Sequence, residues 1–246
     1  MTTHMEKIRM KLNRWLGKSS EKDAVSRGRE LITNMYIKGN GIEIGALYRP
    51  LIVPKIAKVK YVDRMDVPDL RKHYPELNSF DLVNVDIIDN GETLEKIKDG
   101  SQDFVIANHF LEHCQNPLLT LQNMLKVLKI GGVVYIAVPD KRYLWIDIDR
   151  PVTEFKHIKQ DYIDGPENSK EQHFIEWTEY AEKIKEEKAK RQRAAVLMEM
   201  DYSIHFHVWT QNEIMEMLYE AKKIFPFEVE MINKNGHEII FVLSKC

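Results

Sequence analysis

The sequence has little of several features that would place a protein in a class at once. Its 246 residues include two cysteines, Cys114 and Cys246, which excludes a disulfide framework and favours the reducing cytoplasm. It has no long apolar run, since Val133–Val138 falls far short of the roughly 20 residues that a membrane helix needs. The N-terminus is basic and interrupted by charges, so it lacks the apolar centre of a secretory signal. We therefore expect a cytoplasmic protein with no membrane span.

The chain also lacks an excess of charge of one sign. Its 36 Lys and Arg residues face 38 Asp and Glu residues, which gives a formal net charge of -2. This balance argues against a nucleic-acid partner, because nucleic-acid binders usually carry a basic excess. Hydrophobic residues make up 43% of the chain and aromatic residues 9%, which is enough for a large core. The length suits one large domain, or a core domain with a substantial insertion.

In the first half of the chain, short apolar segments alternate with segments whose apolar residues have helical spacing. Five segments are predicted to be strands, at residues 41–45, 59–62, 82–85, 104–107 and 133–138. Between them the pattern predicts a helical turn at 69–74 and helices at 92–97 and 118–128. Parallel strands need long crossover connections, so this alternation predicts a parallel sheet with helices on both faces.

The two flanking regions are predicted to be helical. Residues 22–37 have helical spacing, and the first eighteen residues suit a further short amphipathic helix. From Asp140 to about Asp201 the chain is rich in charge, aromatic residues and histidine, and its later part is helical in character. We interpret this segment as a helical insertion that sits over the sheet.

The last part of the chain returns to the pattern of the core. Thr210 begins a helix that runs to Ile224, and Glu213 three residues later completes a capping box. Two strands, at 227–232 and 238–243, are joined by a turn at Asn233–Gly236, so the sheet is predicted to end in an antiparallel pair. The predicted domains are N-terminal helices at 1–38, a core at 39–139 with 202–246, and a helical cap at 140–201.

The predicted strands end in residues that suit a nucleoside. Gly45 ends the first strand, where a missing side chain lets a ligand approach the backbone. Asp63 ends the second strand, where an acid can accept both ribose hydroxyl hydrogens. Asp86 ends the third predicted strand, placed to meet an adenine amino group, with Ile87 as an apolar wall for the ring. Ligands of open α/β sheets bind at this edge, although plain turn residues at Gly45 and Asp63 are the alternative.

Two longer segments complete the pattern, Ser101–His113 with the sequence SQDFVIANHFLEH and Val127–Gly132 with the sequence VLKIGG. Together with Glu43-Ile-Gly45, Asp63 and Asp86 they resemble class I S-adenosylmethionine-dependent methyltransferases. The resemblance implies a Rossmann-like, doubly wound α/β fold with a seven-stranded sheet, mostly parallel and closed by a terminal antiparallel hairpin. It also implies S-adenosylmethionine as cofactor.

Three further segments are similar to methyltransferases of bacterial capsule and O-antigen gene clusters: Pro139–Tyr143, Asp149–Pro151 and His205–Trp209. There the implied acceptor is a sugar, carried on a nucleotide as in a GDP-heptose. The chain departs from the family at the first loop, where Leu47 and Tyr48 stand in place of repeated glycines. The same departure counts against a nicotinamide dehydrogenase, which needs its glycines more strictly.

The resemblance assigns expected cofactor contacts. Glu43 would orient the first loop or meet the cofactor's amino group, and Gly45, with Ala46 beside it, would contact the methionine portion. The acids at the ends of the second and third strands, with Ile87, would hold the ribose and the adenine. Asn108 and His109, directly after the fourth strand, would face the sulfonium methyl.

Several histidines compete for the role of base. A sugar hydroxyl must lose its proton as the new bond forms, and histidine suits this task because its pKa lies near neutrality. His109 is placed best, and His113 could share its face or be architectural. His205 and His207 alternate with apolar residues, so both could point to one face and line the pocket, bind a metal or form a polar edge. The candidate catalytic residues are therefore His109, His113 and His207.

The acceptor is expected above the fifth strand. Asp140, Lys141 and Arg142 leave its end, and either basic residue could pair with substrate phosphates, a capping salt bridge being the alternative. Three histidines complete the predicted substrate-binding set: His157, His173 and His205. No metal site is predicted, because the spacing matches no strong metal motif.

The sequence thus predicts an S-adenosylmethionine-dependent O-methyltransferase that acts on a sugar hydroxyl. Its expected partners are the cofactor and a small, nucleotide-linked sugar, and a homodimer is left open. One rival is a methyltransferase of another small metabolite or of a lipid. The other is a non-catalytic cofactor-binding scaffold that keeps the fold without turnover.

Overall fold

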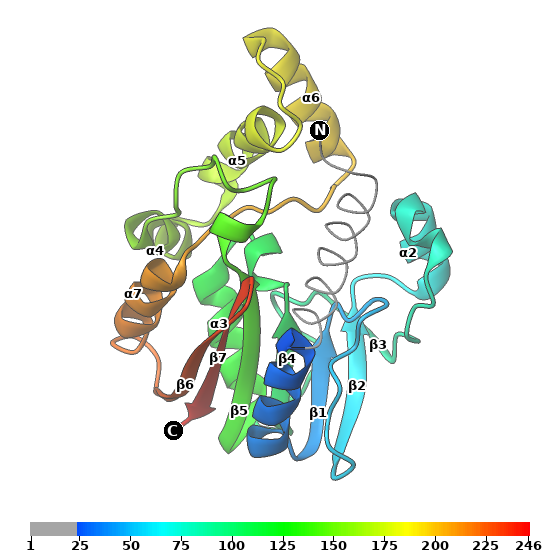
Figure 1. The fold of residues 1–246 in the computed structure, drawn as a ribbon, viewed down its shortest axis with the longest axis vertical. Helices are drawn as coiled ribbons and strands as arrows, with labels where there is room; N and C mark the ends of the chain where they lie inside the picture. The colour runs from blue at the N-terminus through cyan, green and yellow to red at the C-terminus, as the bar shows by residue number, and fades with distance from the viewer. Residues whose placement is uncertain (1–23) are drawn as a thin grey trace, which may run out of the picture.

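The computed structural model describes residues 24–246, and its centre is a seven-stranded sheet with the strand order β3-β2-β1-β4-β5-β7-β6 (Figure 1). The strands are β1 (Gly39–Ile44), β2 (Ala57–Asp63), β3 (Ile87–Ile88), β4 (Gln102–Asn108), β5 (Leu128–Pro139), β6 (Phe227–Asn235) and β7 (Glu238–Lys245). The first five are parallel to one another, whereas β7 pairs antiparallel with both β5 and β6. The predicted fold class, a mainly parallel sheet with a terminal antiparallel pair, is confirmed.

The strand directions bring several chain segments to one edge of the sheet. The carboxyl ends of β1, β2, β3, β4 and β5 meet there, because these strands are parallel. β7 runs the other way, so its first residue lies at this same edge, where Glu238 pairs with Pro139 of β5. Residues from both halves of the chain are therefore neighbours at the carboxyl edge.

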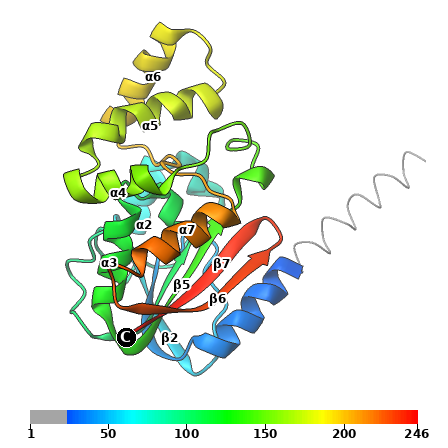
Figure 2. The ribbon, with the colours of Figure 1, turned by 90° about the vertical axis from the view of Figure 1, so that its left-hand side faces the viewer.

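Helices cover both faces of the sheet (Figure 2). On one face, α3 (Pro117–Val127) and α7 (Gln211–Ala221) place leucine, isoleucine and methionine side chains in the larger core cluster. On the other face, residues 24–36 form a helix whose Ile32 lies in a second cluster with Phe104 and Tyr135. The predicted capping box at the start of α7 is confirmed. The Thr210 side chain accepts a hydrogen bond from the backbone of Glu213, and the Glu213 side chain accepts one from the backbone of Thr210.

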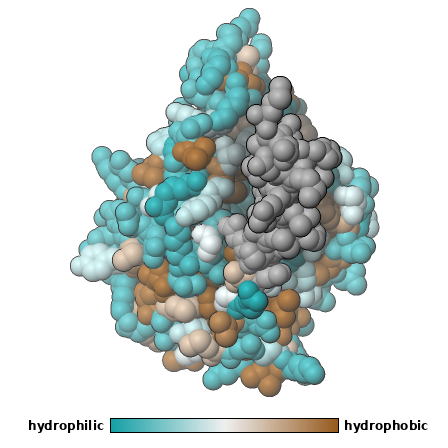
Figure 3. All heavy atoms as spheres, viewed as in Figure 1, coloured by the Kyte–Doolittle hydropathy of each residue, from teal (hydrophilic) through white to brown (hydrophobic). Residues whose placement is uncertain are grey.

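Three further helices lie above the carboxyl edge of the sheet (Figures 1 and 2). They are α4 (Phe155–Asp164), α5 (Glu167–Tyr180) and α6 (Glu187–Glu199), here called the cap helices. They occur where the sequence predicts a helical insertion. α5 and α6 share a small core that includes Phe174 and Leu197, joined by Ile204 and Phe206 from the chain that follows. The outer surface over α6 is mainly hydrophilic (Figure 3).

Short helices connect the remaining elements. They are the α-helix α2 (Val67–His73) and the 3-10 helices η1 (Pro75–Ser79), η2 (Leu111–His113) and η3 (Lys141–Tyr143). The turn predicted at 69–74 corresponds to α2. The predicted N-terminal helix at 22–37 is seen over residues 24–36, and the short helix expected in the first eighteen residues lies outside the described part of the chain.

Two predicted elements are wrong. The third strand is not 82–85 but the two residues Ile87–Ile88, which pair with the end of β2. Residues 92–97 form turns rather than a helix, because Leu94 has a left-handed φ of 50° that interrupts a right-handed helix. Among the described residues, no helix has both the length and the apolar character needed to cross a membrane.

Candidate active site

A cavity of about 880 Å³ opens at the carboxyl edge of the sheet. Its wall includes a residue at or directly after each of four strands, namely Gly45 after β1, Asp63 of β2, Ile88 of β3 and His109 after β4. Another part of the wall comes from Asp201–Ser203, which follow α6. Cavities of roughly 300–1,000 Å³ are typical of cofactor and small-molecule sites, so this is the candidate active site.

The loop after β1 presents its backbone to this cavity. Gly45 has a φ of +64°, in the left-handed region that suits glycine. Leu47 also lines the cavity and has a φ of 50°, so this loop takes a left-handed path at a leucine. Ala46 between them is buried and is not among the cavity-lining residues. Gly91 also lines the cavity and is packed tightly, since an added Cβ would lie 2.5 Å from the side chain of Ile44.

Glu43 holds this loop in place from inside the protein. Its carboxylate is fully buried and accepts hydrogen bonds from the backbone N–H of Leu51 at 2.9 and 3.1 Å and from the side-chain amide of Asn108 at 3.3 Å. Burial raises the pKa of Glu43 to about 7. Neither Glu43 nor Asn108 lines the cavity, so the contacts fit the first expected role of Glu43, orienting the loop.

Asp63 occupies the position that the sequence predicts for it. It ends β2, lines the cavity, and accepts a hydrogen bond from the backbone N–H of Arg64 at 2.8 Å. Burial raises the pKa of Asp63, because the charged form has lost part of its hydration. Hydroxyl donors from a ribose would therefore find an under-solvated acceptor here.

Asp86 and Ile87 are not placed as expected, because the third strand begins later than predicted. Asp86 precedes β3, is exposed, and accepts a hydrogen bond from the backbone N–H of Tyr61 at 2.8 Å. Ile87 packs against the larger core cluster. The acid that follows the strand is Asp89, and it lines the cavity. The residues at this strand end that line the cavity are therefore Ile88 and Asp89 rather than Asp86 and Ile87.

The residues around Asp63 fit an adenosine-containing ligand. Ile88 and Phe110 give the cavity apolar side chains suited to a flat ring. Asp89 is buried, and its two carboxylate oxygens accept hydrogen bonds from the backbone N–H groups of Asn90 and Lys96, at 2.9 and 2.8 Å. These bonds hold the loop after β3 in place beside the cavity. An acid for the ribose, apolar walls for the base and open backbone at the first loop are thus present together.

His109 connects the cavity to the start of β7. Its Nε2 lies 3.0 Å from Glu238 Oε2, and Glu238 is fully buried against Arg29, whose Nε and Nη2 donate at 2.8 and 2.5 Å. Burial alone would raise the pKa of Glu238, but the bonds from Arg29 and His109 lower it to about 2. An ionised Glu238 can only accept, so the Nε2 of His109 carries a proton. On the other side of the ring, Nδ1 lies 3.5 Å from Glu112 Oε1.

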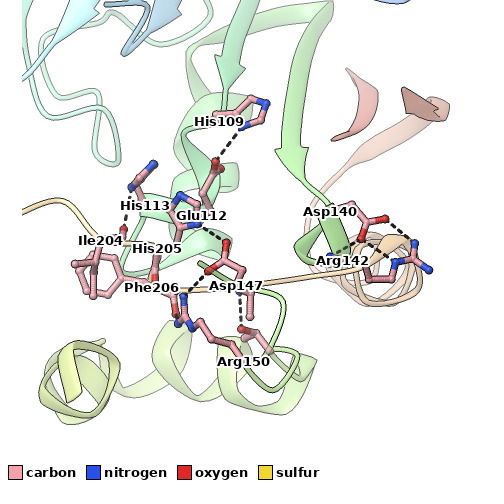
Figure 4. Close-up of polar contacts among 12 residues, drawn as sticks. His109, Glu112, His113, Asp140, Arg142, Asp147, Arg150, Ile204, His205 and Phe206 are labelled. Carbon is pink, nitrogen blue, oxygen red and sulfur yellow. Dashed lines mark hydrogen bonds and ion pairs between the residues drawn. The ribbon is translucent and has the colours of Figure 1, made fainter. Parts of the chain in front are cut away.

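A second histidine group, His113 and His205, lies near His109 on the other side of Glu112 (Figure 4). His113 also lines the cavity, and its Nδ1 lies 2.8 Å from the carbonyl oxygen of Ile204, so Nδ1 carries the proton. Burial lowers the pKa of His113 to about 3, which makes it a weak base. Its ring meets His205 edge-on at 4.7 Å. Glu112 lies beside them, 1% exposed, with neither carboxylate oxygen hydrogen-bonded within the described structure, and burial raises its pKa.

His205 is held by charged groups rather than directed into the cavity. Its Nδ1 lies 2.6 Å from Asp147 Oδ2, and Asp147 also pairs with the buried Arg150 at 3.1 Å (Figure 4). Arg150 donates in turn to the carbonyl oxygens of His205 and Phe206. This network fixes the extended segment after α6.

The three residues after β5 form a local cap. Asp140 is buried and is bonded by the guanidinium of Arg142, with Nε donating at 2.8 Å and Nη2 at 2.5 Å (Figure 4). Lys141 donates to the carbonyl oxygen of Ile148. None of the three lines the cavity, although the Arg142 side chain is 53% exposed. These contacts match the capping alternative.

His157, His173 and His207 lie together outside the cavity. His207 is fully buried, so it does not reach the cavity as a catalytic histidine would. It contacts His173 and His157 edge-on or tilted, with ring centroids 4.9 and 5.5 Å apart. Burial lowers the pKa of His173 to about 3 and that of His207 well below its usual range. The structure thus separates His205 and His207, which the sequence places on one face, into two groups.

Sequence reasoning missed Glu238, Glu112 and Asp89. Glu238 is the first residue of the predicted last strand, and the antiparallel pairing of that strand with β5 places it beside His109. Glu112 lies within the quoted Ser101–His113 segment, three residues after His109. Asp89 was missed because the third strand was placed too early.

A family model described as a methyltransferase domain matches residues 39–221, well over half of the chain. No curated protein matches the chain.

Solved structures resemble the fold at low identity. A Rhodobacter sphaeroides protein described as a zinc-dependent alcohol dehydrogenase is 16% identical, with 87% of this chain and 86% of that chain covered and a TM-score of 0.51. A chain of the complex between the Haloferax volcanii Trm112 methyltransferase activator and a methyltransferase is 14% identical, with 94% and 96% covered and a TM-score of 0.50. A Thermotoga maritima S-adenosylmethionine-dependent methyltransferase is 15% identical, with 95% and 97% covered and a TM-score of 0.46. At these identities the likeness concerns the fold alone.

Proposed function

The chain belongs to the class I S-adenosylmethionine-dependent methyltransferases, with S-adenosylmethionine as its cofactor, and we propose that it methylates a hydroxyl of a nucleotide-linked sugar. The proposal extends to a sugar such as a GDP-heptose in capsule or O-antigen biosynthesis. The observation that carries O-methylation is His109, a cavity-lining histidine whose Nε2 is held by the ionised Glu238.

The cofactor half of the cavity has residues for each part of the ligand. When bound, S-adenosylmethionine supplies an electrophilic methyl group on a sulfonium sulfur. Asp63 would accept the ribose hydroxyls, and Ile88 and Phe110 would flank the adenine. The open backbone at Gly45 would contact the methionine portion, in the loop that Glu43 holds from below.

His109 would act as the general base. Glu238 holds its Nε2–H, so Nδ1 is the nitrogen that can take the hydroxyl proton as the oxygen attacks the methyl carbon and the carbon–sulfur bond breaks. The imidazolium that forms would lie between two carboxyl groups, Glu238 on Nε2 and Glu112 on Nδ1. A positioned base is typically worth about 10²–10⁴-fold in rate. Alignment of the reacting atoms by the cavity adds to this.

A polar acceptor is supported by the other wall of the cavity. Gln115, Asp201 and Ser203 line it and offer amide, carboxylate and hydroxyl groups. Sugar hydroxyls can bond to all three types of group. We keep the exposed Arg142, with Lys141, as the candidate for acceptor phosphates, because both follow β5 at the same edge of the sheet.

The test is methylation of a panel of acceptors. The protein is incubated with S-adenosylmethionine and GDP-, UDP- and dTDP-linked sugars, and products are separated and weighed by mass spectrometry. We expect a nucleotide sugar that gains one methyl group, with S-adenosylhomocysteine formed in equal amount. Methylation of amines or lipids alone would contradict the sugar acceptor, and cofactor binding with no turnover on any acceptor would favour the scaffold.

A further inference from the structure

Three histidines and an aspartate converge at the base of the cap helices. His157 and Asp161 lie one turn apart on α4, His173 lies on α5, and His207 lies on the extended segment before α7. One possible ligand atom from each lies within 4.8 Å of all the others. We propose that these four residues bind one divalent transition-metal ion, most simply Zn²⁺, in a structural site separate from the cofactor cavity.

The distances within the cluster suit coordination. His157 Nε2 lies 2.9 Å from His173 Nε2 and 3.2 Å from Asp161 Oδ2. In a tetrahedral zinc site with metal–nitrogen bonds of about 2.1 Å, neighbouring ligand atoms lie roughly 3.4 Å apart. A small outward adjustment of the ligands would therefore accommodate the ion.

The cluster contains acceptors that lack donors. Asp161 is 3% exposed, and its Oδ2 makes no hydrogen bond within the described structure, although it lies 3.2 Å from His157 Nε2; Nδ1 of the fully buried His207 makes none either. Buried polar atoms are nearly always paired, so two unpaired ones in a single cluster call for a ligand. A cation would provide both lone pairs with a partner.

The outer contacts resemble those that orient metal ligands. The other oxygen of Asp161 accepts the hydroxyl of Ser169 at 2.9 Å, and Nε2 of His207 lies 3.5 Å from the carbonyl oxygen of Gln115. Metal-bound histidines commonly use their second nitrogen in this way.

The ligand types indicate a zinc-like ion. Imidazole suits zinc and neighbouring first-row metals, whereas calcium and magnesium prefer oxygen ligands. Four protein ligands fill a tetrahedral site, which is the structural rather than the catalytic arrangement. The nearby Arg150 does not oppose a cation strongly, because Asp147 and Glu176 pair with it at 3.1 and 3.2 Å. His157 is 36% exposed and gives the ion a route of entry.

The site would tie the cap helices to the segment that borders the active site. His207 and Phe206 both donate from their backbones to the carbonyl oxygen of Glu112, whose side chain lies beside His109. None of the four ligands lines the cofactor cavity. The ion would therefore stabilise the wall of the cavity without taking part in methyl transfer.

The test is metal binding by the full chain without an affinity tag. The protein is treated with a chelator, then titrated with Zn²⁺ by calorimetry and with Co²⁺ by visible spectroscopy. We expect one equivalent of each, with the intense visible absorption of tetrahedral Co²⁺, and a higher melting temperature with zinc. No stoichiometric binding by the wild-type protein, or an octahedral cobalt spectrum, would overturn the proposal.

Variants locate the ion. Asp161→Asn keeps the shape of the side chain and its bond to Ser169, and we expect it and His173→Gln to weaken zinc binding by about tenfold or more. His237→Gln is the matched control, because His237 belongs to a different group of possible ligands, with His109 and Glu238. Binding that survives in Asp161→Asn and His173→Gln, or that is lost in His237→Gln, would place the metal elsewhere. Circular dichroism and S-adenosylhomocysteine binding check that each variant is folded.

Discussion

His109 combines an accessible position with a fixed orientation. Its side chain is one-third exposed at the cavity, and its backbone has a φ of 48°, a left-handed conformation that is unusual outside glycine. Such conformations persist where surrounding contacts hold them, and they cluster at functional sites. Here the hydrogen bond to Glu238 is one of those contacts.

Replacing His109 with glutamine should remove the base and leave the fold intact. We expect kcat to fall by about 10²–10⁴-fold, while the dissociation constant for S-adenosylhomocysteine changes little. Steady-state kinetics and calorimetry measure the two quantities. His237→Gln is the control, because His237 is a neighbouring histidine, with its ring centroid 6.4 Å from that of His109, and it does not line the cavity. An unchanged kcat in His109→Gln would rule out His109 as the base.

Glu43 should make the stability of the protein depend on pH. Its folded pKa of about 7 lies above the ordinary value of 4.5, so its favourable contribution is complete below about pH 4.5 and is lost as the pH rises through 7. The difference corresponds to about 3 kcal/mol. Glu43→Gln has no such loss, because the amide does not ionise, and its oxygen can still accept from Leu51 and from Asn108.

We therefore expect Glu43→Gln to be more stable than the wild-type protein at pH 8, with the advantage shrinking toward pH 4.5. Urea unfolding of both proteins between these pH values measures the difference. A constant difference across the range would show that Glu43 does not titrate there.

The sequence places some site residues correctly and others not, for a physical reason. Gly45 and His109 directly follow β1 and β4, whose buried apolar runs fix the strand ends, and Asp63 is the last residue of the seven-residue β2. Asp86 follows the apolar run at 82–85, which forms a loop rather than a strand, so the sequence pattern points to an exposed acid instead of the strand-end acid. His157, His173 and His207 come from three elements, and no local spacing shows that they meet.

At the level of elements, long strands and helices are predictable because each buries a periodic apolar face. β3 has two residues, too few for a pattern, and it is positioned by pairing with β2. The helix expected at 92–97 is overridden by tertiary contacts. Glu92 accepts the backbone N–H groups of Gln115 and Asn116 before α3, so its side chain serves a distant helix start.

The start of α7 gives a prediction at this scale. Thr210 is the N-cap, and its hydroxyl and backbone N–H both bond to Glu213. Thr210→Ala should lower the free energy of unfolding by about 1 kcal/mol, because the first turn of the helix loses its cap. Glu216→Ala, on the exposed middle of α7, is the control and should change stability by less than about 0.5 kcal/mol. Denaturant unfolding measures both, and equal effects would contradict the capping role.

Considered as a whole, the molecule places ligand contacts at one edge of a rigid sheet. The residues that line the cavity belong mainly to the ends of β1, β2, β3 and β4, to the loops that follow them and to the segment after α6, while β6 is the edge strand at the other end of the strand order and contributes no lining residue. Binding should therefore order the loops selectively, since loops open more readily than core strands.

Hydrogen exchange should show this selectivity. With saturating S-adenosylhomocysteine, we expect slower exchange at residues 45–49, 63–66, 88–92 and 109–113, and no change in β6. Mass spectrometry of peptic fragments measures it. Uniform slowing across the sheet would indicate global stabilisation only, and slowing confined to α5 and α6 would place the ligand in the cap helices.

The most direct measurement is calorimetric titration of S-adenosylhomocysteine into the wild-type protein, Asp63→Asn and Asp86→Asn. We expect stoichiometric binding by the wild-type protein and a loss of about 10–100-fold in Asp63→Asn, because hydrogen bonds to a charged group are the strong ones. Asp86→Asn should bind as the wild-type protein does, since Asp86 is exposed and lies outside the cavity. Equal affinity in Asp63→Asn and the wild-type protein, or a loss in Asp86→Asn, would contradict a cofactor site built on Asp63.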